Sequence, residues 1–391
     1  MNVAGIICEY NPFHTGHAYM IGELRRRGAD AVVCAMSGHF VQRGEAAVAG
    51  KAARAEMALR CGADLVFEIP TPWAASSAET FARGGVAILR AAGVVTELAF
   101  GSESGDLAAL EAVARALDSE AYRRALSRQG EELPFAMRRQ AAIGALLGER
   151  YGALLEQPND ILAVEYLRAL SGSAIRPVAI RRRGAAHDGA LCDGVPSGAL
   201  LRQLLYRGET EQALGLLPSE AAEVLRREID AGRAPARMAY GERAILDRLR
   251  RMDEEAFAPF DSGGEGLYHR FYRAVRQSGS IEELLAQAAT KRYPTARLRR
   301  MMLHAWLDLP PAGERVPYLR LLAVSATGRE VLRRMGNAPV LTKAADVDKL
   351  GAEAAALFTK EARWSDLYAL TCPVPPPCGE DWRITPVVRE D

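Results

Sequence analysis

Long apolar runs and a secretion signal are both missing from this sequence of 391 residues. No stretch approaches the roughly 20 consecutive apolar residues that a membrane-spanning helix needs. The apolar residues at the start have no charged segment before them and no cleavage site of small residues after them, so they do not resemble a signal peptide. We therefore expect a cytoplasmic protein that does not act at a membrane.

Cysteine is scarce, with six in the chain. Cys8, Cys34, Cys61 and Cys192 are dispersed, mostly among apolar neighbours, as is usual for reduced thiols in a core. Cys372 and Cys378 flank a proline-rich loop, where no second Cys or His pair lies close enough in the sequence to complete a zinc site. This pattern argues against a disulfide framework, and we expect no metal site made by the protein.

An excess of positive charge is also lacking, because 50 Lys and Arg face 49 Asp and Glu, for a net charge of +1. This balance argues against a uniformly basic nucleic-acid-binding protein. Basic residues nevertheless cluster at 25–27, 181–183, 248–251 and 291–300. Any one cluster is explained by a solvated helix face, but several together favour a polyanionic partner. The length favours two domains.

Residues 3–20 have the pattern of a strand, a turn and a helix. Val3, Ile6 and Ile7 belong to a nearly continuous apolar run, which is typical of a strand buried on both faces of a parallel sheet. Asn11 and Pro12 end that run. From 17 to 24 apolar residues and a histidine recur every three or four positions, which predicts an amphipathic helix.

His14, Thr15, Gly16 and His17 stand where this helix is predicted to begin. A helix N-terminus has unpaired backbone N–H groups and the positive end of a dipole, so it attracts anions. Gly16 has no side chain to keep a phosphate away, and imidazoles three residues apart share one helix face. An isolated His-x-x-His pair is more often surface decoration or half of a metal site. Its place directly after a buried strand favours the phosphate site.

The segment EYNPFHTGH resembles the HxGH signature of the adenylyl-transferring nucleotidyltransferases. Together with MSGHFVQRGEAAVAGKAAR, it resembles the bacterial tRNA(Met) cytidine acetate ligases in particular. The resemblance implies a Rossmann-like parallel-sheet domain that binds ATP, in which His14 and His17 stabilise the transition state at the α-phosphorus. It also implies ATP contacts along the whole segment: Ile7, Cys8, Glu9, Tyr10, Asn11, Pro12, Phe13, His14, Thr15, Gly16 and His17. Mg²⁺ on the leaving pyrophosphate is expected for ATP chemistry.

Further strands are predicted at 31–36, 64–70, 96–101 and 175–180, and a helix at 74–92. Ligand-binding residues of such folds gather at the carboxyl ends of parallel strands. Lys51, just before a predicted helix at 52–62, is a candidate for neutralising the β- and γ-phosphates; the alternative is a capping or surface lysine.

The resemblance implies nucleotide contacts by Gly101, Asn159 and one of Arg182 and Arg183. Without it, Gly101 is a turn glycine and Asn159 is the cap of the following helix. Residues 195–202 stand in place of a second signature of the superfamily, ISSxxIR, but two hydroxyl positions are occupied by Pro196 and Ala199. Phosphate contacts are left to Ser197, Arg202 and backbone N–H groups at the helix start.

Beyond residue 203 the strand signal disappears and apolar residues recur at helical spacing. We expect an α/β domain over 1–203, followed by an all-helical domain over 204–391 that binds tRNA. The candidate contacts are Lys291, Arg292, Arg297 and Arg300, of which the last two share one helix face. The alternative is that these arginines pair with acidic residues inside their own domain.

The function that the resemblance implies is an ATP-dependent ligase. It would form acetyl-adenylate from acetate and ATP and acetylate the exocyclic amine of the wobble cytidine of elongator tRNA(Met). Two other classes stay open: a small-molecule adenylyltransferase of the HxGH type, and a nucleotide-binding regulator that has lost catalysis. A requirement for RNA in product formation would distinguish the ligase from the small-molecule adenylyltransferase. Pyrophosphate release from ATP and acetate would exclude the regulator.

Overall fold

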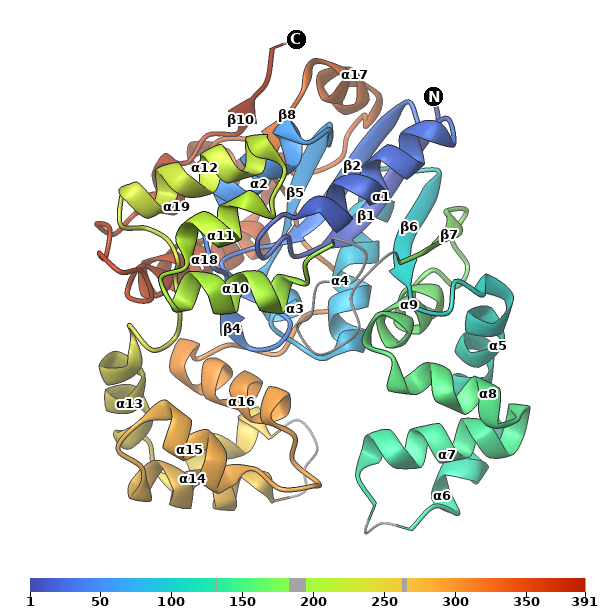
Figure 1. The fold of residues 1–391 in the computed structure, drawn as a ribbon, viewed down its shortest axis with the longest axis vertical. Helices are drawn as coiled ribbons and strands as arrows, with labels where there is room; N and C mark the ends of the chain where they lie inside the picture. Colours follow the sequence, from blue (N-terminus) through green and yellow to red (C-terminus); the bar gives the residue numbers. More distant parts are fainter. Residues whose placement is uncertain (131–132, 183–194, 262–265, 391) are drawn as a thin grey trace.

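A computed structural model describes residues 1–130, 133–182, 195–261 and 266–390. At its centre is a sheet with the strand order β10-β8-β5-β2-β1-β6-β7, with β9 paired to β8 (Figure 1). The strands are β1 Val3–Cys8, β2 Ala31–Ser37, β5 Leu65–Ile69, β6 Glu97–Ser102, β7 Arg176–Arg181, β8 Leu319–Val324, β9 Val340–Leu341 and β10 Val387–Val388. All neighbouring strands are parallel except β5 and β8, which are antiparallel. A separate hairpin pairs β3 Phe40–Val41 with β4 Glu45–Ala46.

The two central strands are buried on both faces, as their apolar sequences predicted. Every residue of β1 and β2 is buried. Their side chains alternate between two cores, because Val3 and Ile7 pack into one core whereas Ile6 and Cys8 pack into the other. A parallel sheet covered by helices on both faces requires this near-continuous hydrophobicity. The predicted α/β fold class is confirmed.

Helices cover both faces of the sheet (Figure 1). The core that contains Ile7 includes residues of α3 Thr71–Ala74, α4 Ala78–Ala91 and α9 Pro158–Ala169. The other core includes residues of α1 Thr15–Arg26, α2 Lys51–Arg60, α10 Gly198–Tyr206, α11 Thr210–Gly215 and α12 Ser219–Asp230. A Cβ atom on Gly85 would lie 2.7 Å from Cγ2 of Ile7, so this glycine permits close contact between α4 and the sheet. The helix predicted over 74–92 corresponds to α4, which begins only after its N-cap Ser77; Ala74 is instead the last residue of the short helix α3.

Two groups of helices lie below the sheet in Figure 1, on the side toward which β1 runs from the N-terminus. One group comprises α5 Leu107–Leu117, α6 Glu120–Ser127, α7 Phe135–Leu147, α8 Glu149–Gly152 and the 3-10 turn η1 Ala153–Glu156. The other, which we call the helical lobe, comprises α13 Glu242–Arg250, η2 Glu254–Phe260, α14 Leu267–Gln277, α15 Ile281–Ala288 and α16 Thr295–Leu307. Phe257, Phe271 and Met302 belong to the core of this lobe.

The second half is mostly helical, as predicted, but it also contributes strands to the sheet, so it is not the all-helical domain that the loss of strand signal indicated. β8 joins the sheet beside β5, and β10 pairs with β8. The remaining elements of this half are α17 Ala326–Arg334, η3 Ala344–Leu350, α18 Ala352–Ala369 and α19 Glu380–Arg383. β8 is a fully buried strand of six residues, interrupted by a charged residue, Arg320. Periodicity alone cannot distinguish so short an apolar run from a buried helical segment.

Among the described residues, no helix is long and apolar enough to cross a membrane. Cys8, Cys34 and Cys372 are buried free thiols, and Cys378 is an exposed one. Cys192 lies outside the described residues.

Candidate active site

The predicted phosphate site lies at the junction of β1 and α1, where two histidines cap the helix. His14 is the N-cap, and its Nδ1 accepts a hydrogen bond from the backbone amide of Gly16 at 3.1 Å. Nδ1 of His17 accepts from the backbone amide of His14, also at 3.1 Å. This is the reciprocal geometry of a capping box, which is commonly built from Ser or Thr and Glu or Gln.

The caps determine which ring nitrogens carry protons. A nitrogen that accepts a hydrogen bond has no proton, so in each neutral ring the proton is assigned to Nε2. Burial, together with the charges of Arg182 and Arg202, lowers the pKa of His14 to about 3. Burial and the neighbouring His14 also hold the pKa of His17 well below its ordinary value. The two rings stack with their centroids 3.7 Å apart, and each neutral ring keeps one Nε2–H donor.

Gly16 protects this arrangement. A Cβ atom there would lie 3.0 Å from Cε1 and 3.1 Å from Nδ1 of His14, and 3.3 Å from Cγ1 of Val195. Any side chain would therefore crowd the capping imidazole and the access to the first helical turn.

The other residues of the histidine segment lie mostly in the protein interior. Ile7 and Cys8 end β1 with buried side chains, and Pro12 is buried as well. Tyr10 and Phe13 pack against the ring of His17, with centroid separations of 4.8 Å and 5.4 Å. In the turn and at the helix start, Asn11 is buried, and Glu9 and Thr15 are partly buried. Contacts of Ile7, Cys8 and Phe13 with a nucleotide would therefore have to come largely from their backbones.

The second predicted phosphate segment lies against the first. α10 begins after Ser197, whose Oγ accepts a hydrogen bond from the amide of Leu200 at 3.1 Å. Nη1 of Arg202 donates to the carbonyl oxygen of Asn11 at 2.7 Å, while Oδ1 of Asn11 accepts from the amide of Val48 at 2.7 Å. The Asn11 side chain thus fixes the turn, and Arg202 adds positive charge beside the histidines.

Gly101, Asn159 and Arg182, for which the resemblance implied nucleotide contacts, lie close together at the end of β6. Nη1 of Arg182 donates to Oδ1 of Asn159 at 3.3 Å, and a Cβ on Gly101 would lie 3.2 Å from Cγ of Arg182. Asn159 is not the cap that its sequence context suggested, because α9 begins after Gln157 with Asn159 inside the first turn. Its Nδ2 donates instead to Oε1 of Glu103 at 2.5 Å. Arg183 lies outside the described residues.

Two residues that support the site were missed from the sequence. The buried carboxylate of Asp160 accepts hydrogen bonds from Oγ of Ser102 at 2.5 Å and from the amide of Glu103 at 3.1 Å, which fixes the loop after β6. The buried guanidinium of Arg54 donates to the carbonyl oxygens of Glu9, Ser37, Gly38 and Ala49. Arg54 therefore ties together the loops that follow β1 and β2.

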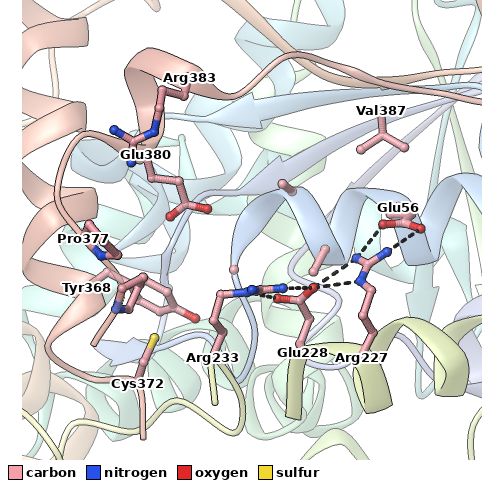
Figure 2. A pocket seen from close by; sticks show the side chains of 14 residues that line it. Glu56, Arg227, Glu228, Arg233, Tyr368, Cys372, Pro377, Glu380, Arg383 and Val387 are labelled. Atoms are coloured by element: carbon pink, nitrogen blue, oxygen red, sulfur yellow. Dashed lines mark hydrogen bonds and ion pairs between the residues drawn. The ribbon is translucent and has the colours of Figure 1, made fainter. Parts of the chain in front are cut away.

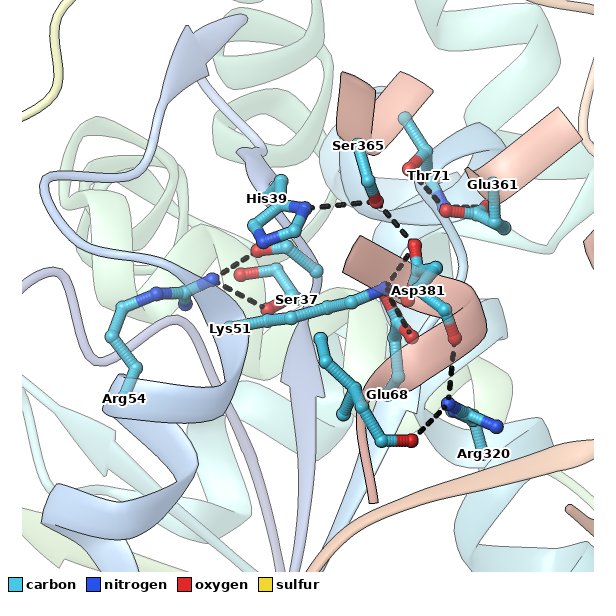
Figure 3. Close-up of polar contacts among 12 residues, drawn as sticks. Ser37, His39, Lys51, Arg54, Glu68, Thr71, Arg320, Glu361, Ser365 and Asp381 are labelled. Carbon is cyan, nitrogen blue, oxygen red and sulfur yellow. Dashed lines mark hydrogen bonds and ion pairs between the residues drawn. The ribbon is translucent and has the colours of Figure 1, made fainter. Parts of the chain in front are cut away.

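Lys51 does not have the surroundings of a phosphate ligand. It is 1% exposed, and its Nζ lies 2.7 Å from Oε1 of Glu68 and 2.7 Å from Oδ1 of Asp381 (Figure 3). Burial alone would lower the pKa of Lys51, but the carboxylates of Asp381 and Glu68 outweigh it and raise the pKa. The ammonium of Lys51 would have to leave both carboxylates before it could reach ATP. A surface position, the alternative for this lysine, is also excluded.

Lys51 belongs to a cluster that joins α18 and α19 to the residues after β2. We call it the buried network; its members are His39, Lys51, Glu68, Thr71, Glu361, Ser365 and Asp381. Nδ1 of His39 lies 3.0 Å from Oγ of Ser365, and that hydroxyl donates to the carboxylate of Asp381 (Figure 3). Oγ1 of Thr71 donates to Oε2 of Glu361 at 2.7 Å. These side chains thus pair with one another, although Nε2 of His39 has no hydrogen-bond partner among the described residues.

The basic residues predicted to bind tRNA fall into two pairs. Lys291 and Arg292 are exposed in the turn before α16. Arg297 is instead ion-paired with Asp261 at 3.1 Å, and the two side chains are only 17% and 2% exposed. Nη1 of Arg300 donates to the carbonyl of Gln42 at 3.4 Å, and burial lowers the pKa of Arg300 to about 10. The expected open stripe of Arg297 and Arg300 is therefore absent, because both side chains are held by neighbouring elements.

A separate cavity of about 330 Å³ lies between α2, α12 and the C-terminal segment (Figure 2). Its lining residues are Gly50, Ala52, Ala53, Glu56, Arg227, Glu228, Arg233, Tyr368, Cys372, Pro376, Pro377, Glu380, Arg383 and Val387. Arg227 pairs with Glu56 at 2.7 Å and Arg233 pairs with Glu228 at 2.7 Å. The charged side chains that line the cavity are thus partly neutralised by one another. None of the lining residues belongs to the histidine segment.

Comparison with known proteins places this geometry in a family. The family HIGH Nucleotidyl Transferase matches residues 1–377. The tRNA(Met) cytidine acetate ligase of Syntrophomonas wolfei is 34% identical over 99% of this chain and 99% of its own. That of Fervidobacterium nodosum is 36% identical over 86% of this chain and 81% of its own. The chain belongs to the tRNA(Met) cytidine acetate ligase family.

Solved structures within this family have the same fold. A crystal structure of Thermotoga maritima TmcAL bound with alpha-thio ATP is 32% identical and covers 100% of both chains, with a TM-score of 0.91. The apo form of the same protein superimposes with a TM-score of 0.94. Because each match covers 100% of both chains, it includes the helical lobe and the C-terminal strands.

Proposed function

We propose that this chain is an ATP-dependent ligase that acetylates a cytidine of tRNA(Met). The observation that carries the proposal is the pair of neutral, mutually capped histidines at the start of α1, in a chain that matches the named ligases over its whole length. By resemblance, the acceptor is the wobble cytidine of elongator tRNA(Met). Since the acceptor is a tRNA, we place the reaction in the cytoplasm.

In the first half-reaction, a carboxylate oxygen of acetate attacks the α-phosphorus of ATP. The bond to the bridging oxygen breaks, pyrophosphate leaves, and acetyl-adenylate remains. The Nε2–H groups of His14 and His17 donate to phosphate oxygens, and Arg182 and Arg202 add positive charge. Because the donors are held in place before ATP arrives, they need little reorganisation as charge develops. Gly101 and Asn159 hold the nucleoside.

In the second half-reaction, the exocyclic N4 of cytidine attacks the acetyl carbonyl carbon. The bond to the phosphate oxygen breaks, AMP leaves with that oxygen, and N4 loses one proton. Positioning of the two reactants supplies most of the catalysis in this step. We propose that Lys291 and Arg292 contribute to tRNA binding, because they are exposed cations on the helical lobe.

Mg²⁺ is expected to accompany ATP. The described residues contain no group of three or more His, Cys, Asp or Glu placed to hold a metal ion. Mg²⁺ commonly keeps several waters and binds substrate phosphates together with one or two carboxylates, so a dedicated protein cage is not required. When bound, the ion would neutralise charge on the leaving pyrophosphate.

The test is to incubate the purified protein with ATP, acetate and tRNA(Met), and to analyse the digested tRNA by mass spectrometry. We expect N4-acetylcytidine only when all three substrates are present, with one pyrophosphate released per acetyl group. A product that forms without RNA, such as a dinucleotide, would instead support the small-molecule adenylyltransferase. No pyrophosphate release with ATP and acetate would support a regulator.

A further inference from the structure

The β3–β4 hairpin connects the helical lobe to the histidine segment. At its tip the amide of Gln42 donates to Oε1 of Glu9 at 2.7 Å, and Nε2 of Gln42 donates to the carbonyl of Ser76 at 3.2 Å. On the other side, Glu45 is ion-paired with Arg299 of α16 at 2.5 Å. The tip is therefore fixed from both sides, between the turn after β1 and the first turns of α16.

Gly44 allows α16 to approach the hairpin this closely. Its φ of +75° lies in the left-handed region. A Cβ atom at Gly44 would lie 2.5 Å from the backbone nitrogen of Arg300 and 2.9 Å from the carbonyl oxygen of Arg299. The backbone of the helical lobe thus packs directly on the tip, with no room for a side chain between them.

Arg43, between Gln42 and Gly44, is the exception at this tip. Its neighbours Gln42 and Glu45 are engaged by other elements, whereas Arg43 is exposed and makes no hydrogen bond or ion pair with any residue in the described parts of the chain. Its charge does act on the site, because it helps to offset the effect of burial, which raises the pKa of Glu9. The backbone that carries Arg43 is thus held in place, while its guanidinium stays available to a ligand.

The position of Arg43 differs from that of the arginines around the histidines. Arg202 donates to the carbonyl oxygen of Asn11, and Arg182 contacts Asn159, whereas Arg43 has neither of these neighbours among the described residues. Arg43 follows Gln42, whose amide donates to Glu9, and precedes Gly44, on which the backbone of α16 packs, so its backbone lies between the turn after β1 and the helical lobe. An exposed cation at this junction is within reach of a polyanion that extends from the helical lobe toward the histidine site.

We propose that Arg43 binds a backbone phosphate of the tRNA beside the acceptor cytidine, and that the β3–β4 hairpin holds it in place for that contact. The inference rests on the proposed function. A guanidinium binds phosphate through two parallel hydrogen bonds, so one fixed Arg43 would orient the RNA strand as well as attract it. Fixing the strand here would bring N4 of the cytidine to the acetyl carbonyl.

The test compares Arg43→Ala and Arg43→Glu with the matched control Arg333→Glu. Arg333 is an exposed arginine of α17, at the opposite end of the molecule from the helical lobe (Figure 1). Three quantities are measured for each protein: the melting temperature, acetate-dependent pyrophosphate release without RNA, and equilibrium tRNA affinity over a range of salt concentrations. Arg43→Lys is added to separate charge from two-point hydrogen bonding.

For Arg43→Ala we expect about a tenfold loss of tRNA affinity, since one charge-assisted phosphate contact contributes about 1.4 kcal/mol. The slope of log affinity against log salt should fall by about one phosphate equivalent. Arg43→Glu should lose more, Arg43→Lys less, and Arg333→Glu almost nothing. Melting temperature and RNA-free pyrophosphate release should stay at the wild-type level.

Two results would overturn the inference. If RNA-free pyrophosphate release falls as far as tRNA affinity, Arg43 is an ATP ligand. If tRNA affinity is unchanged in a normally folded Arg43→Glu protein, the hairpin does not touch the RNA. Failure of the proposed function is distinguishable, because it would be seen as the absence of acetylated cytidine with the wild-type protein, whereas the affinity measurement needs no chemistry.

Discussion

The histidine site and the buried network use similar residue types in opposite ways. At the start of α1, His14 and His17 each use only Nδ1 to accept a hydrogen bond from the backbone, so each Nε2–H remains available for a ligand. In the buried network, Lys51 is paired with Glu68 and Asp381. On sequence grounds, the two histidines and Lys51 were all candidates for phosphate binding. The difference shows that the chemistry of a polar side chain depends on which of its atoms the fold has already used.

The largest effect on stability is expected for a substitution of Lys51 in the buried network. Lys51→Met should leave two buried carboxylates without their cation and lower the free energy of unfolding by about 3 to 5 kcal/mol, measured by denaturant unfolding. The matched variant Lys51→Met with Glu68→Gln removes one of the stranded charges and should recover part of the loss. If Lys51→Met had normal stability but lost ATP affinity, Lys51 would be a nucleotide ligand.

At the histidine site, His17→Asn should affect rate rather than folding. The Asn Oδ1 can still accept the hydrogen bond from the amide of His14, but the Nε2–H donor is lost. We expect acetate-dependent pyrophosphate release to fall about 10²- to 10³-fold, the usual effect of one transition-state donor, with a smaller change in ATP affinity. Near-native turnover in this variant would remove His17 from the catalytic site.

A third comparison concerns the two pairs of basic residues near α16. Arg297→Ala should lower the free energy of unfolding by about 2 kcal/mol, because its ion pair with Asp261 is largely buried. Lys291→Ala with Arg292→Ala should leave the melting temperature nearly unchanged and weaken tRNA binding. Thermal melts and tRNA affinities measured on both proteins decide between them: a stable Arg297→Ala protein with lost tRNA affinity would restore the predicted phosphate contact.

The smallest expected effect is on acid stability. Because the pKa of His14 is lowered to about 3 in the folded protein, the unfolded chain binds more protons, so stability is lost as pH falls below about 6.5. The cost of this group should reach about 1 kcal/mol near pH 5.5. Unfolding curves at pH 7 and pH 5.5 should therefore differ less for His14→Asn than for the wild type. An equal acid loss in both proteins would show that His14 is not buried and neutral.

Local patterns predicted the parts of the fold and site that lie close together in sequence. The apolar runs of β1 and β2, the turn at Pro12 and the helix start at His14 all follow from neighbouring residues. The environments of Lys51 and Arg297 could not be predicted this way, because their partners Asp381 and Asp261 are set by tertiary contacts. β8 was missed since its buried run reads equally well as part of a helix.

Isotope transfer from acetate tests the central claim, adenylation of acetate at the histidine site, most directly. The protein is supplied with ATP, tRNA(Met) and acetate labelled with ¹⁸O in both carboxylate oxygens, and the products are analysed by mass spectrometry. Attack at the α-phosphorus predicts one ¹⁸O in AMP, one in the acetyl group of N4-acetylcytidine and none in pyrophosphate. Unlabelled AMP, or label in a phosphate product accompanied by ADP, would contradict it.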